Sequence, residues 1–232
     1  MNLSVVIPCY CNPDPVIRHL EACAKAQRKP DEVLVIDDGF PEGHLFARLW
    51  QLDWPFRMIY ARILVDIPWN QPGARNLGLL LARGDAISFE DADHLPDPTY
   101  YAAAENELRS DGMVLVRAQR INPEGKRLKP SPGSWIVRRD AMLTVGGYDE
   151  DFSGHYGHDD YQALRRLARR YPGAMRILKD GFSIARDGAA RGRLRDDARN
   201  RNLLKSKLKE TVNHGPVLRF PWTVAIVKER KG

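Results

Sequence analysis

The sequence predicts an α/β protein whose mostly parallel sheet is flanked by helices, and three observations near its start predict this fold. Residues 3–7 form a short apolar, β-branched run that Pro8 ends, as expected for a buried strand. Residues 15–26 have helical spacing, and residues 33–36 form a second buried run that ends in Asp37-Asp38-Gly39. Strand, helix and strand in this order form a βαβ unit, which requires parallel strands.

The same alternation continues along the chain. Residues 56–60 and 86–89 are predicted strands, and the helix predicted for residues 73–82 between them ends at Arg83-Gly84-Asp85. Beyond them the sequence predicts a strand at 113–118, a Pro/Gly/Lys-rich loop at 122–133, a basic amphipathic helix at 159–170 and a charged helix at 195–210.

Polar clusters follow three of the predicted strands. They are residues 8–10, the Asp37-Asp38 pair, and Asp91-Ala92-Asp93. Because parallel sheets bind ligands beyond the carboxyl ends of their strands, we expect these clusters to converge at one edge.

The chain has 232 residues, a hydrophobic fraction of 43% and a formal net charge of +6. A basic balance favours anionic partners such as nucleotide diphosphates, anionic membranes or nucleic acid, although a solvated basic surface accounts for it equally. The acidic clusters at the strand ends argue against nucleic acid. Lys and Arg concentrate in residues 186–231.

The cysteines and the hydropathy pattern predict a cytoplasmic protein. Cys9, Cys11 and Cys23 are odd in number and poorly spaced for disulfides, so reduced thiols are expected. Pro8 ends the first apolar run too early for a signal peptide, and no apolar run approaches the roughly 20 residues of a membrane span.

The Asp91-Ala92-Asp93 motif predicts a site for a hard divalent cation, Mn²⁺ or Mg²⁺. Two carboxylates one residue apart in a turn can face one ion, and such ions bind through oxygen ligands shared with substrate phosphates. A solvated acidic turn is the alternative for the tripeptide alone.

Seven blocks of sequence, in order, resemble family 2 glycosyltransferases. They are VVIPCYCN at 5–12, EVLVIDDG at 32–39, GARNLG at 73–78, ARGD at 82–85, SFEDAD at 88–93, VGGYDEDF at 145–152 and YGHDD at 156–160. The resemblance covers about residues 3–170 and implies a single domain of the glycosyltransferase A type, with a Rossmann-like sheet, that transfers a sugar with inversion.

The resemblance also implies roles for individual residues on the donor side. The donor is expected to be a nucleotide-diphosphate sugar, most commonly a uridine diphosphate sugar. Asp37 or Asp38 would bind the nucleobase, Arg75 would lie near the nucleotide or its phosphates, Asp91 would contact the ribose or sugar and Asp93 the metal. Pro8, Tyr10 and Gly73 complete the expected donor pocket.

Asp159 matches the family's catalytic aspartate and would be the general base that takes a proton from the acceptor hydroxyl. Asp is also a preferred N-cap, so a capping role for Asp159 is the alternative. Asp160 could equally be the cap, or it could contact the acceptor.

Two histidines depart from the family pattern. His158 stands where the family commonly has Glu, and His94 stands where it often has a further Asp. Imidazole binds Mn²⁺ as well as softer ions, so each is a metal-ligand candidate with a hydrogen-bonded surface His as the alternative. The stretch 182–188 lacks the metal-binding His of many relatives; this leaves the third ligand open, and Arg186 could contact the diphosphate instead.

Trp135 and Tyr156 are candidates for stacking on a carbohydrate acceptor, and ordinary core packing is the alternative for both. We expect a catalytic domain at residues 1–185, with a nucleotide-binding half at 1–95 and an acceptor half at 96–185, followed by a basic C-terminal extension at 186–232. The extension would serve an anionic membrane surface or acceptor, and a solvated helix with a packed terminal strand is the alternative.

Three rival functions remain at this point. A sugar nucleotidyltransferase would need a Gly-rich basic loop after the first strand, where this chain has Pro8-Cys9-Tyr10-Cys11. A basic membrane or nucleic-acid module does not explain the acidic strand ends. An inactive nucleotide-sugar-binding relative would fit the His158 substitution.

Overall fold

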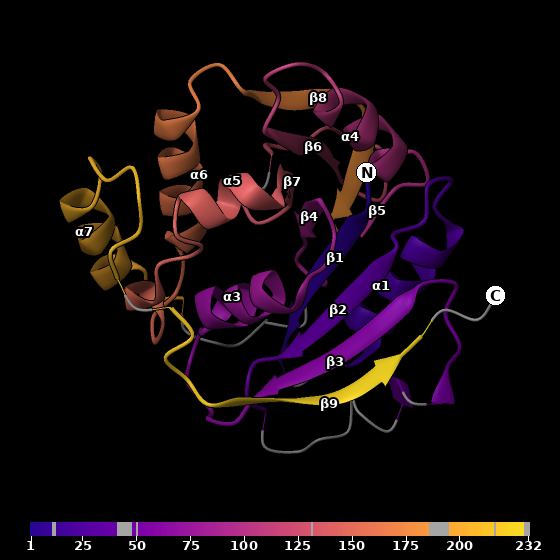
Figure 1. Ribbon diagram of the computed structural model, residues 1–232, viewed down its shortest axis with the longest axis horizontal. Helices are drawn as coiled ribbons and strands as arrows, with labels where there is room; N and C mark the ends of the chain where they lie inside the picture. Colours follow the sequence, from indigo (N-terminus) through magenta and orange to yellow (C-terminus); the bar gives the residue numbers. More distant parts are fainter. Residues whose placement is uncertain are drawn as a thin grey trace.

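A four-stranded parallel core forms the centre of the fold (Figure 1). The structure, a computed structural model, describes residues 1–10, 13–40, 48–49, 51–130, 132–185, 195–215 and 217–229. The core strands lie in the order β3-β2-β1-β4. They are β1 (Leu3–Cys9), β2 (Glu32–Asp37), β3 (Arg57–Ile63) and β4 (Ala86–Phe89).

The chain changes direction across the sheet between β1 and β4. From β1 it moves outward to β2 and β3, and it then returns to place β4 on the other side of β1. Ligands of open α/β sheets bind at such a switch point, beyond the carboxyl ends of the two strands. Pro8 and Asp91 therefore belong to segments that flank the expected binding crevice.

Antiparallel strands extend the core on both sides into a nine-stranded sheet. β7 (Trp135–Arg138) pairs with β4, and β9 (Trp222–Lys228) pairs with β3 at the opposite edge. The remaining strands are β6 (Leu115–Ile121), which is antiparallel to β7, β8 (Met175–Ala185), which is parallel to β6, and the short β5 (His94–Pro96), which is antiparallel to β8.

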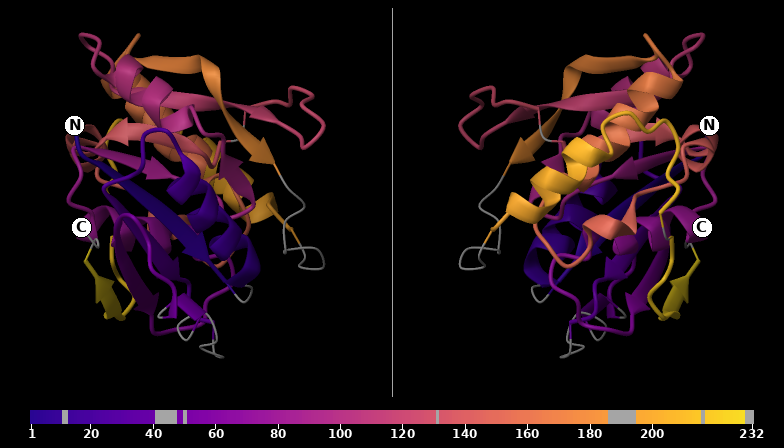
Figure 2. Two further views of the ribbon diagram at one scale, coloured as in Figure 1. Left: turned by 90° about the vertical axis from the view of Figure 1, so that its right-hand side faces the viewer. Right: turned by 90° about the vertical axis from the view of Figure 1, so that its left-hand side faces the viewer.

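Helices cover both faces of the sheet, and each face has its own apolar cluster (Figures 1 and 2). On one face, α1 (Pro13–Lys25) and α4 (Tyr100–Leu108) bury side chains such as Leu20 and Tyr101. The other face carries α3 (Gln71–Leu81), α5 (Arg139–Thr144) and α6 (Asp159–Arg170). The short helix η1 (Glu150–Phe152) precedes α6, and α7 (Ala198–Ser206) packs outside α6.

The predicted α/β fold with a parallel sheet and flanking helices is confirmed. The strand predicted at 86–89 and the helix predicted at 159–170 match β4 and α6. Part of the C-terminal region belongs to the main sheet, because β9 hydrogen-bonds to β3 and Ile226 is buried in the core. This observation agrees with the alternative of a helix followed by a packed terminal strand.

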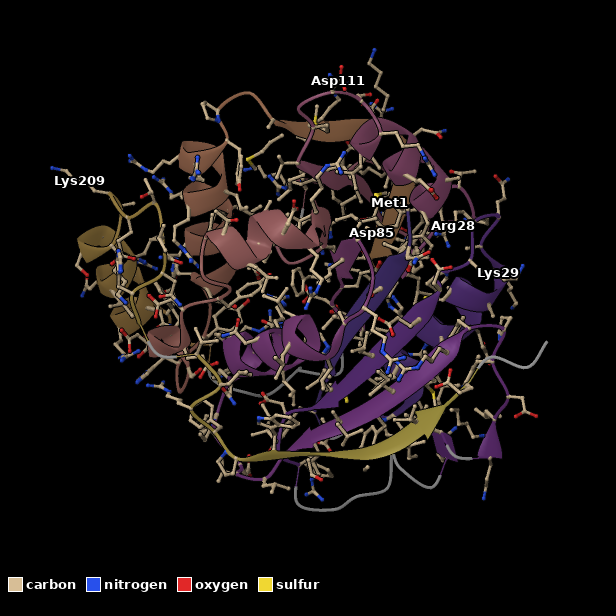
Figure 3. The ribbon with its side chains drawn as sticks, viewed as in Figure 1. Met1, Arg28, Lys29, Asp85, Asp111 and Lys209 are labelled. Atoms are coloured by element: carbon tan, nitrogen blue, oxygen red, sulfur yellow. The ribbon has the colours of Figure 1, made fainter. Side chains whose placement is uncertain are left out.

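The amino-terminal edge of the sheet carries a polar network of its own. Asp85 accepts a hydrogen bond from the backbone N–H of Asn2 at 2.8 Å, and Arg28 donates to the carbonyl of Met1 at 2.9 Å. Met1, Arg28 and Asp85 lie together in Figure 3, at the edge opposite the carboxyl ends of the parallel strands. Among the described residues, no helix is both long and apolar enough to cross a membrane.

Candidate active site

Asp91, Asp93 and His94 form a cluster that could hold a metal ion. They follow β4 directly, and one ligand atom from each lies within 4.8 Å of the others. His94 is the first residue of β5 and is buried, and its Nδ1 lies 3.1 Å from the hydroxyl of Ser134. Two carboxylates and one imidazole form a donor set that suits Mn²⁺.

Neighbouring residues fix the position of the Asp91 carboxylate. Gln71, in the first turn of α3, donates to Oδ1 of Asp91 at 2.8 Å. Gly133 approaches Asp91 so closely that a Cβ there would lie 2.3 Å from Oδ2 of Asp91. No motif in the sequence marks Gln71, Gly133 or Ser134 as residues of the site.

Arg75, on α3, connects Asp91 to the start of α6. Its Nη2 donates to Oδ1 of Asp91 at 2.8 Å, and its Nη1 lies 3.4 Å from Oδ2 of Asp159 and also donates to Oδ1 of Asp160. The guanidinium lies 5.2 Å from the centre of the Tyr148 ring. Although burial alone would lower the pKa of Arg75, the surrounding carboxylates raise it well above its ordinary value, so Arg75 stays charged.

The observed partners of Arg75 are carboxylates of the protein itself, and its proximity to a nucleotide remains a prediction. Its side chain is 0% exposed, and its charge is engaged by three carboxylates of the protein. A buried cation among several carboxylates holds them together and offsets part of their mutual repulsion.

Asp159 and Asp160 are the first two residues of α6, and both are buried. The N-cap is His158, whose side chain makes no capping hydrogen bond, so the alternative that Asp159 or Asp160 caps the helix is wrong. Asp160 is firmly held, because its Oδ1 accepts from Arg75 and, at 3.2 Å, from the Tyr148 hydroxyl. The longer contact of Asp159 to Arg75 leaves Asp159 less constrained.

The electrostatics of the pair favour a base near neutral pH. The pKa of the Asp159 carboxyl is raised to about 7, chiefly because burial penalises its charged form. The negative charge of Asp160 adds to the rise, and Arg75 opposes it. A general base works best when its pKa lies near the operating pH, and Asp159 meets this condition.

The predicted nucleobase side gathers after β1 and β2. Asp37 accepts hydrogen bonds from the Tyr60 hydroxyl at 2.5 Å and from the backbone N–H of Phe40 at 3.0 Å. Oδ1 of the buried Asp38 has no hydrogen-bond partner within the described residues. Burial raises the pKa of this carboxyl well above its ordinary value, and hydrogen bonds with Asn70 oppose that rise. Tyr10 donates to Asp66 at 2.8 Å, and Pro8 ends the apolar part of β1 beside it.

Asp38 is thus better placed to bind a ligand than Asp37, whose oxygens already accept protein donors. Gly73 has a packing role, because a Cβ there would come within 2.6 Å of the Asn70 side chain. The absence of a side chain at Gly73 leaves room for Asn70 against the first turn of α3, the helix from which Gln71 and Arg75 reach Asp91.

His158 lies apart from the metal cluster. Its Nε2 is 2.9 Å from Oδ2 of Asp197, just before α7, and its backbone is left-handed with φ 71°. Of the two candidate histidines, only His94 joins Asp91 and Asp93 in the described structure. Arg186 lies outside the described residues.

The two acceptor candidates differ sharply. Trp135 is 0% exposed and packs against Phe89 and Tyr148 at centroid distances of 5.2 and 6.0 Å. It is a core residue with no ring face left for a ligand, so its assignment to the acceptor site is wrong. Tyr156 is only partly buried, and its ring meets Trp69 edge-on at 4.8 Å.

Trp69 is a residue that the sequence analysis missed. It precedes α3, is partly buried, and has φ 53°, a left-handed conformation that is uncommon for a bulky residue. Strained backbones of this kind cluster at functional sites. Trp69 precedes Gln71, which contacts Asp91, and Tyr156 precedes Asp159. The rings of Trp69 and Tyr156 touch each other.

Comparisons with known proteins identify the family of the chain. The family model described as "Glycosyl transferase family 2" matches residues 4–171. Over 93 residues the chain is 30% identical to the amylovoran biosynthesis glycosyltransferase AmsB of Erwinia amylovora, an alignment that covers 40% of this chain and 31% of AmsB.

Solved structures share the fold at low sequence identity. The S. aureus protein TarS (residues 1–349) superposes with a TM-score of 0.65 at 17% identity, over 80% of this chain and 60% of TarS. The mannosyltransferase PcManGT of Pyrobaculum calidifontis, solved with GDP-Man and Mn²⁺, gives 0.60 at 17% identity, over 82% of this chain and 58% of PcManGT. The chain thus spans less than two thirds of these relatives.

The family match extends from β1 through α6 and includes both the metal cluster and the Asp159–Asp160 pair. From this match and the shared fold we conclude that the chain is a glycosyltransferase that belongs to glycosyl transferase family 2.

Proposed function

We propose that the protein transfers a sugar from a nucleotide-diphosphate donor, a uridine diphosphate sugar, to an acceptor hydroxyl with inversion at the anomeric carbon. The observation that carries this proposal is the link through Arg75. One buried cation joins Asp91, in the candidate metal cluster, to the Asp159–Asp160 pair at the start of α6. A donor diphosphate and an attacking hydroxyl need these two kinds of group close together.

Asp91, Asp93 and His94 would hold Mn²⁺ or Mg²⁺, which when bound supplies Lewis-acid stabilisation to a diphosphate leaving group. Asp159 then takes the proton of the acceptor hydroxyl as that oxygen attacks the anomeric carbon. A single displacement of this kind needs one base and inverts the configuration. Arg75 and Tyr148 hold Asp160 and keep the start of α6 in place.

Asp38 is the proposed partner of the nucleobase. The ring N–H of uracil could donate to its Oδ1, a buried oxygen for which the described residues provide no partner. A buried acceptor without a donor is costly, and a nucleobase would remove that cost. Tyr10, held by Asp66, and Pro8 would line the same pocket.

We further propose that Trp69 and Tyr156 contact the acceptor, a carbohydrate or another hydroxyl compound. Their rings touch beside the two halves of the proposed site, and Arg195 lies 5.3 Å from the centre of the Tyr156 ring. Aromatic faces stack on the apolar faces of sugar rings, and a nearby cation would favour an acidic sugar.

A screen of nucleotide sugars by thermal stabilisation tests the donor assignment. A ligand that binds only the folded protein stabilises it by about 2.7 kcal/mol when its concentration is 100 times Kd. We expect a uridine diphosphate sugar to raise Tm in the presence of Mn²⁺ and to lose the effect with EDTA. Equal stabilisation by all nucleotide sugars without metal would contradict the proposal, and donor binding without donor hydrolysis would favour an inactive relative.

Peripheral association with an anionic membrane is a separate proposal. Trp222, Val224 and Val227 of β9 expose large apolar side chains, and the net charge of +6 favours anionic surfaces. Several basic side chains of the C-terminal region, including Lys207 and Arg219, are paired with acidic residues of the same molecule. The exposed face of β9 therefore supports the membrane proposal more than the basic residues do.

A further inference from the structure

The loop at residues 145–158 leads directly into Asp159, and its position determines where that carboxylate lies. Four of its glycines, Gly146, Gly147, Gly154 and Gly157, have positive φ, and so does His158. Apart from the short helix η1, a run with so many left-handed residues has no regular hydrogen-bonding pattern of its own. Its backbone carbonyls must therefore find partners elsewhere.

Many of those partners come from residues 195–215, here called the C-terminal clamp. This segment runs beside the loop (Figures 1 and 2) and contacts it at its start, middle and end. At the start of the loop, Asn213 donates through Nδ2 to the carbonyls of Gly146 and Tyr148, both at 3.1 Å. In its middle, Lys207 forms ion pairs with Asp149 and, at 2.8 Å, with Asp151.

The contacts closest to Asp159 come from the first turn of α7. Asn200 is 0% exposed, and its Nδ2 lies 2.9 Å from each of three carbonyl oxygens, those of Phe152, His155 and Gly157. The two hydrogens of this amide are shared among three carbonyl oxygens, so one side chain connects three points along the loop. Asp197 adds the 2.9 Å contact to His158, the residue immediately before Asp159.

We propose that Asn200 and Asp197 are positioning residues that fix residues 152–158 and thereby hold Asp159 in place for catalysis, a role that rests on the proposed function of Asp159 as the base. Neither residue is close enough to Asp91 or Asp159 to be linked to it by a hydrogen bond within the described residues. Their side chains contact the loop and one neighbour each within α7: Asn200 Oδ1 accepts from Arg199 at 3.0 Å, and Asp197 accepts from Arg201. Catalysis is sensitive to such support, because a displacement of about 1 Å can reduce a rate about 100-fold.

Asn200→Ala is the first test, and Asn202→Ala is its matched control. Asn202 lies on the same helix but is exposed to solvent, so the control removes the same side chain without touching the loop. We expect Asn200→Ala to lower kcat about 10- to 100-fold while Kd for the donor with Mn²⁺ stays within about twofold. The control should leave both unchanged.

An exchange of the His158–Asp197 pair provides a rescue test. Asp197→Ala should lower kcat, and the double variant His158→Asp with Asp197→His, which restores an imidazole–carboxylate contact at the same two positions, should recover part of the loss. A merely structural role would lower Tm, donor affinity and kcat together. That parallel loss, or a wild-type kcat in Asn200→Ala, would overturn the proposal.

Hydrogen exchange separates this proposal from the proposed function. The amides of residues 152–158 should exchange faster in Asn200→Ala than in wild type or Asn202→Ala, whether or not a donor or acceptor is known. Unchanged protection in Asn200→Ala would overturn the positioning role. If exchange is faster in Asn200→Ala but the wild-type protein neither binds nor hydrolyses any nucleotide sugar, the proposed function is refuted. The clamp is then a purely structural device, and the catalytic part of this proposal is overturned with it.

Discussion

Asp159 is the residue on which the proposed chemistry depends. Its carboxyl is buried and has a pKa raised to about 7. Arg75 contacts this carboxyl from 84 positions away in the sequence, at 3.4 Å. Asp160 beside it is occupied by Arg75 and Tyr148. The two adjacent carboxylates therefore differ in how firmly they are held, and this difference supports the proposal that the less constrained Asp159 is the base.

Asp159→Asn should keep donor binding and lower the transfer rate about 10²- to 10⁴-fold, because an amide cannot take the acceptor's proton. Calorimetric titration with donor and Mn²⁺ measures the binding, and a transfer assay measures the rate. Transfer at the wild-type rate would assign the base to another residue, and Asp160 would be tested next.

The raised pKa of Asp159 also predicts how the rate and the stability depend on pH. Because the base must be deprotonated, kcat/KM should fall about tenfold for each pH unit below about 7. Between the ordinary Asp pKa of about 3.9 and a folded-state pKa of about 7, the folded protein binds more protons than the unfolded chain. The stability that this proton contributes is full at lower pH and is lost as the pH rises towards 7.

Asp159→Asn should therefore raise Tm relative to wild type at pH 8, and the difference should shrink towards pH 5. Thermal melts of both proteins across this range measure it, with exposed Asp196→Asn as the control. A difference in Tm that grows as the pH falls would contradict the raised pKa.

At the scale of secondary-structure elements, the loop between β6 and β7 places Gly133 against the metal cluster. Gly133→Ala should displace Asp91, because the new Cβ would lie 2.3 Å from its Oδ2, and should weaken Mn²⁺-dependent donor binding at least tenfold. Gly125→Ala in the same loop is the control, since its surroundings are open and only its positive φ of 81° adds strain. Equal donor affinity in the two variants would show that the close approach has no role.

The sequence predicted the elements whose pattern is local. The β-branched runs were sufficient to predict β1, β2 and β4, and the amphipathic period was sufficient to predict α6. The motif Asp91-Ala92-Asp93 after a strand end indicated the candidate metal cluster. β5 and β7 are only three and four residues long and were missed, because so short a run carries no clear period. α4 was also missed, although Asp97 and Thr99 before its Ala-rich stretch are start signals.

The contacts that complete the site are separated along the chain, and this is why the sequence could not predict them. Arg75 meets Asp160 across 85 positions and Gly133 across 58. Trp135 was assigned to the acceptor because an aromatic residue alone does not indicate whether its ring is exposed. The pairing of His158 with Asp197 equally required the folded chain.

For the molecule as a whole, the exposed apolar side chains of β9 and the net charge of +6 predict binding to anionic vesicles. Vesicle co-sedimentation should detect the protein with anionic but not with neutral lipid, and Trp222→Ser with Val227→Ser should reduce the bound fraction. Both side chains belong to an edge strand and are more than a third exposed, and because Trp222 also packs near Ile63 and Phe220, the Tm of the variant is measured beside its binding. Equal behaviour with the two lipids would contradict the membrane proposal.

The central claim is that Asp91, Asp93 and His94 bind the metal that holds the donor, while Asp159 acts only in the chemical step. Calorimetric titration of a uridine diphosphate sugar into wild type, Asp93→Ala and Asp159→Asn, each with and without Mn²⁺, tests it most directly. We predict Mn²⁺-dependent binding to wild type and to Asp159→Asn, and a loss of at least tenfold in affinity for Asp93→Ala. Unaltered, Mn²⁺-dependent binding to Asp93→Ala, or binding to wild type that does not need metal, would contradict the claim.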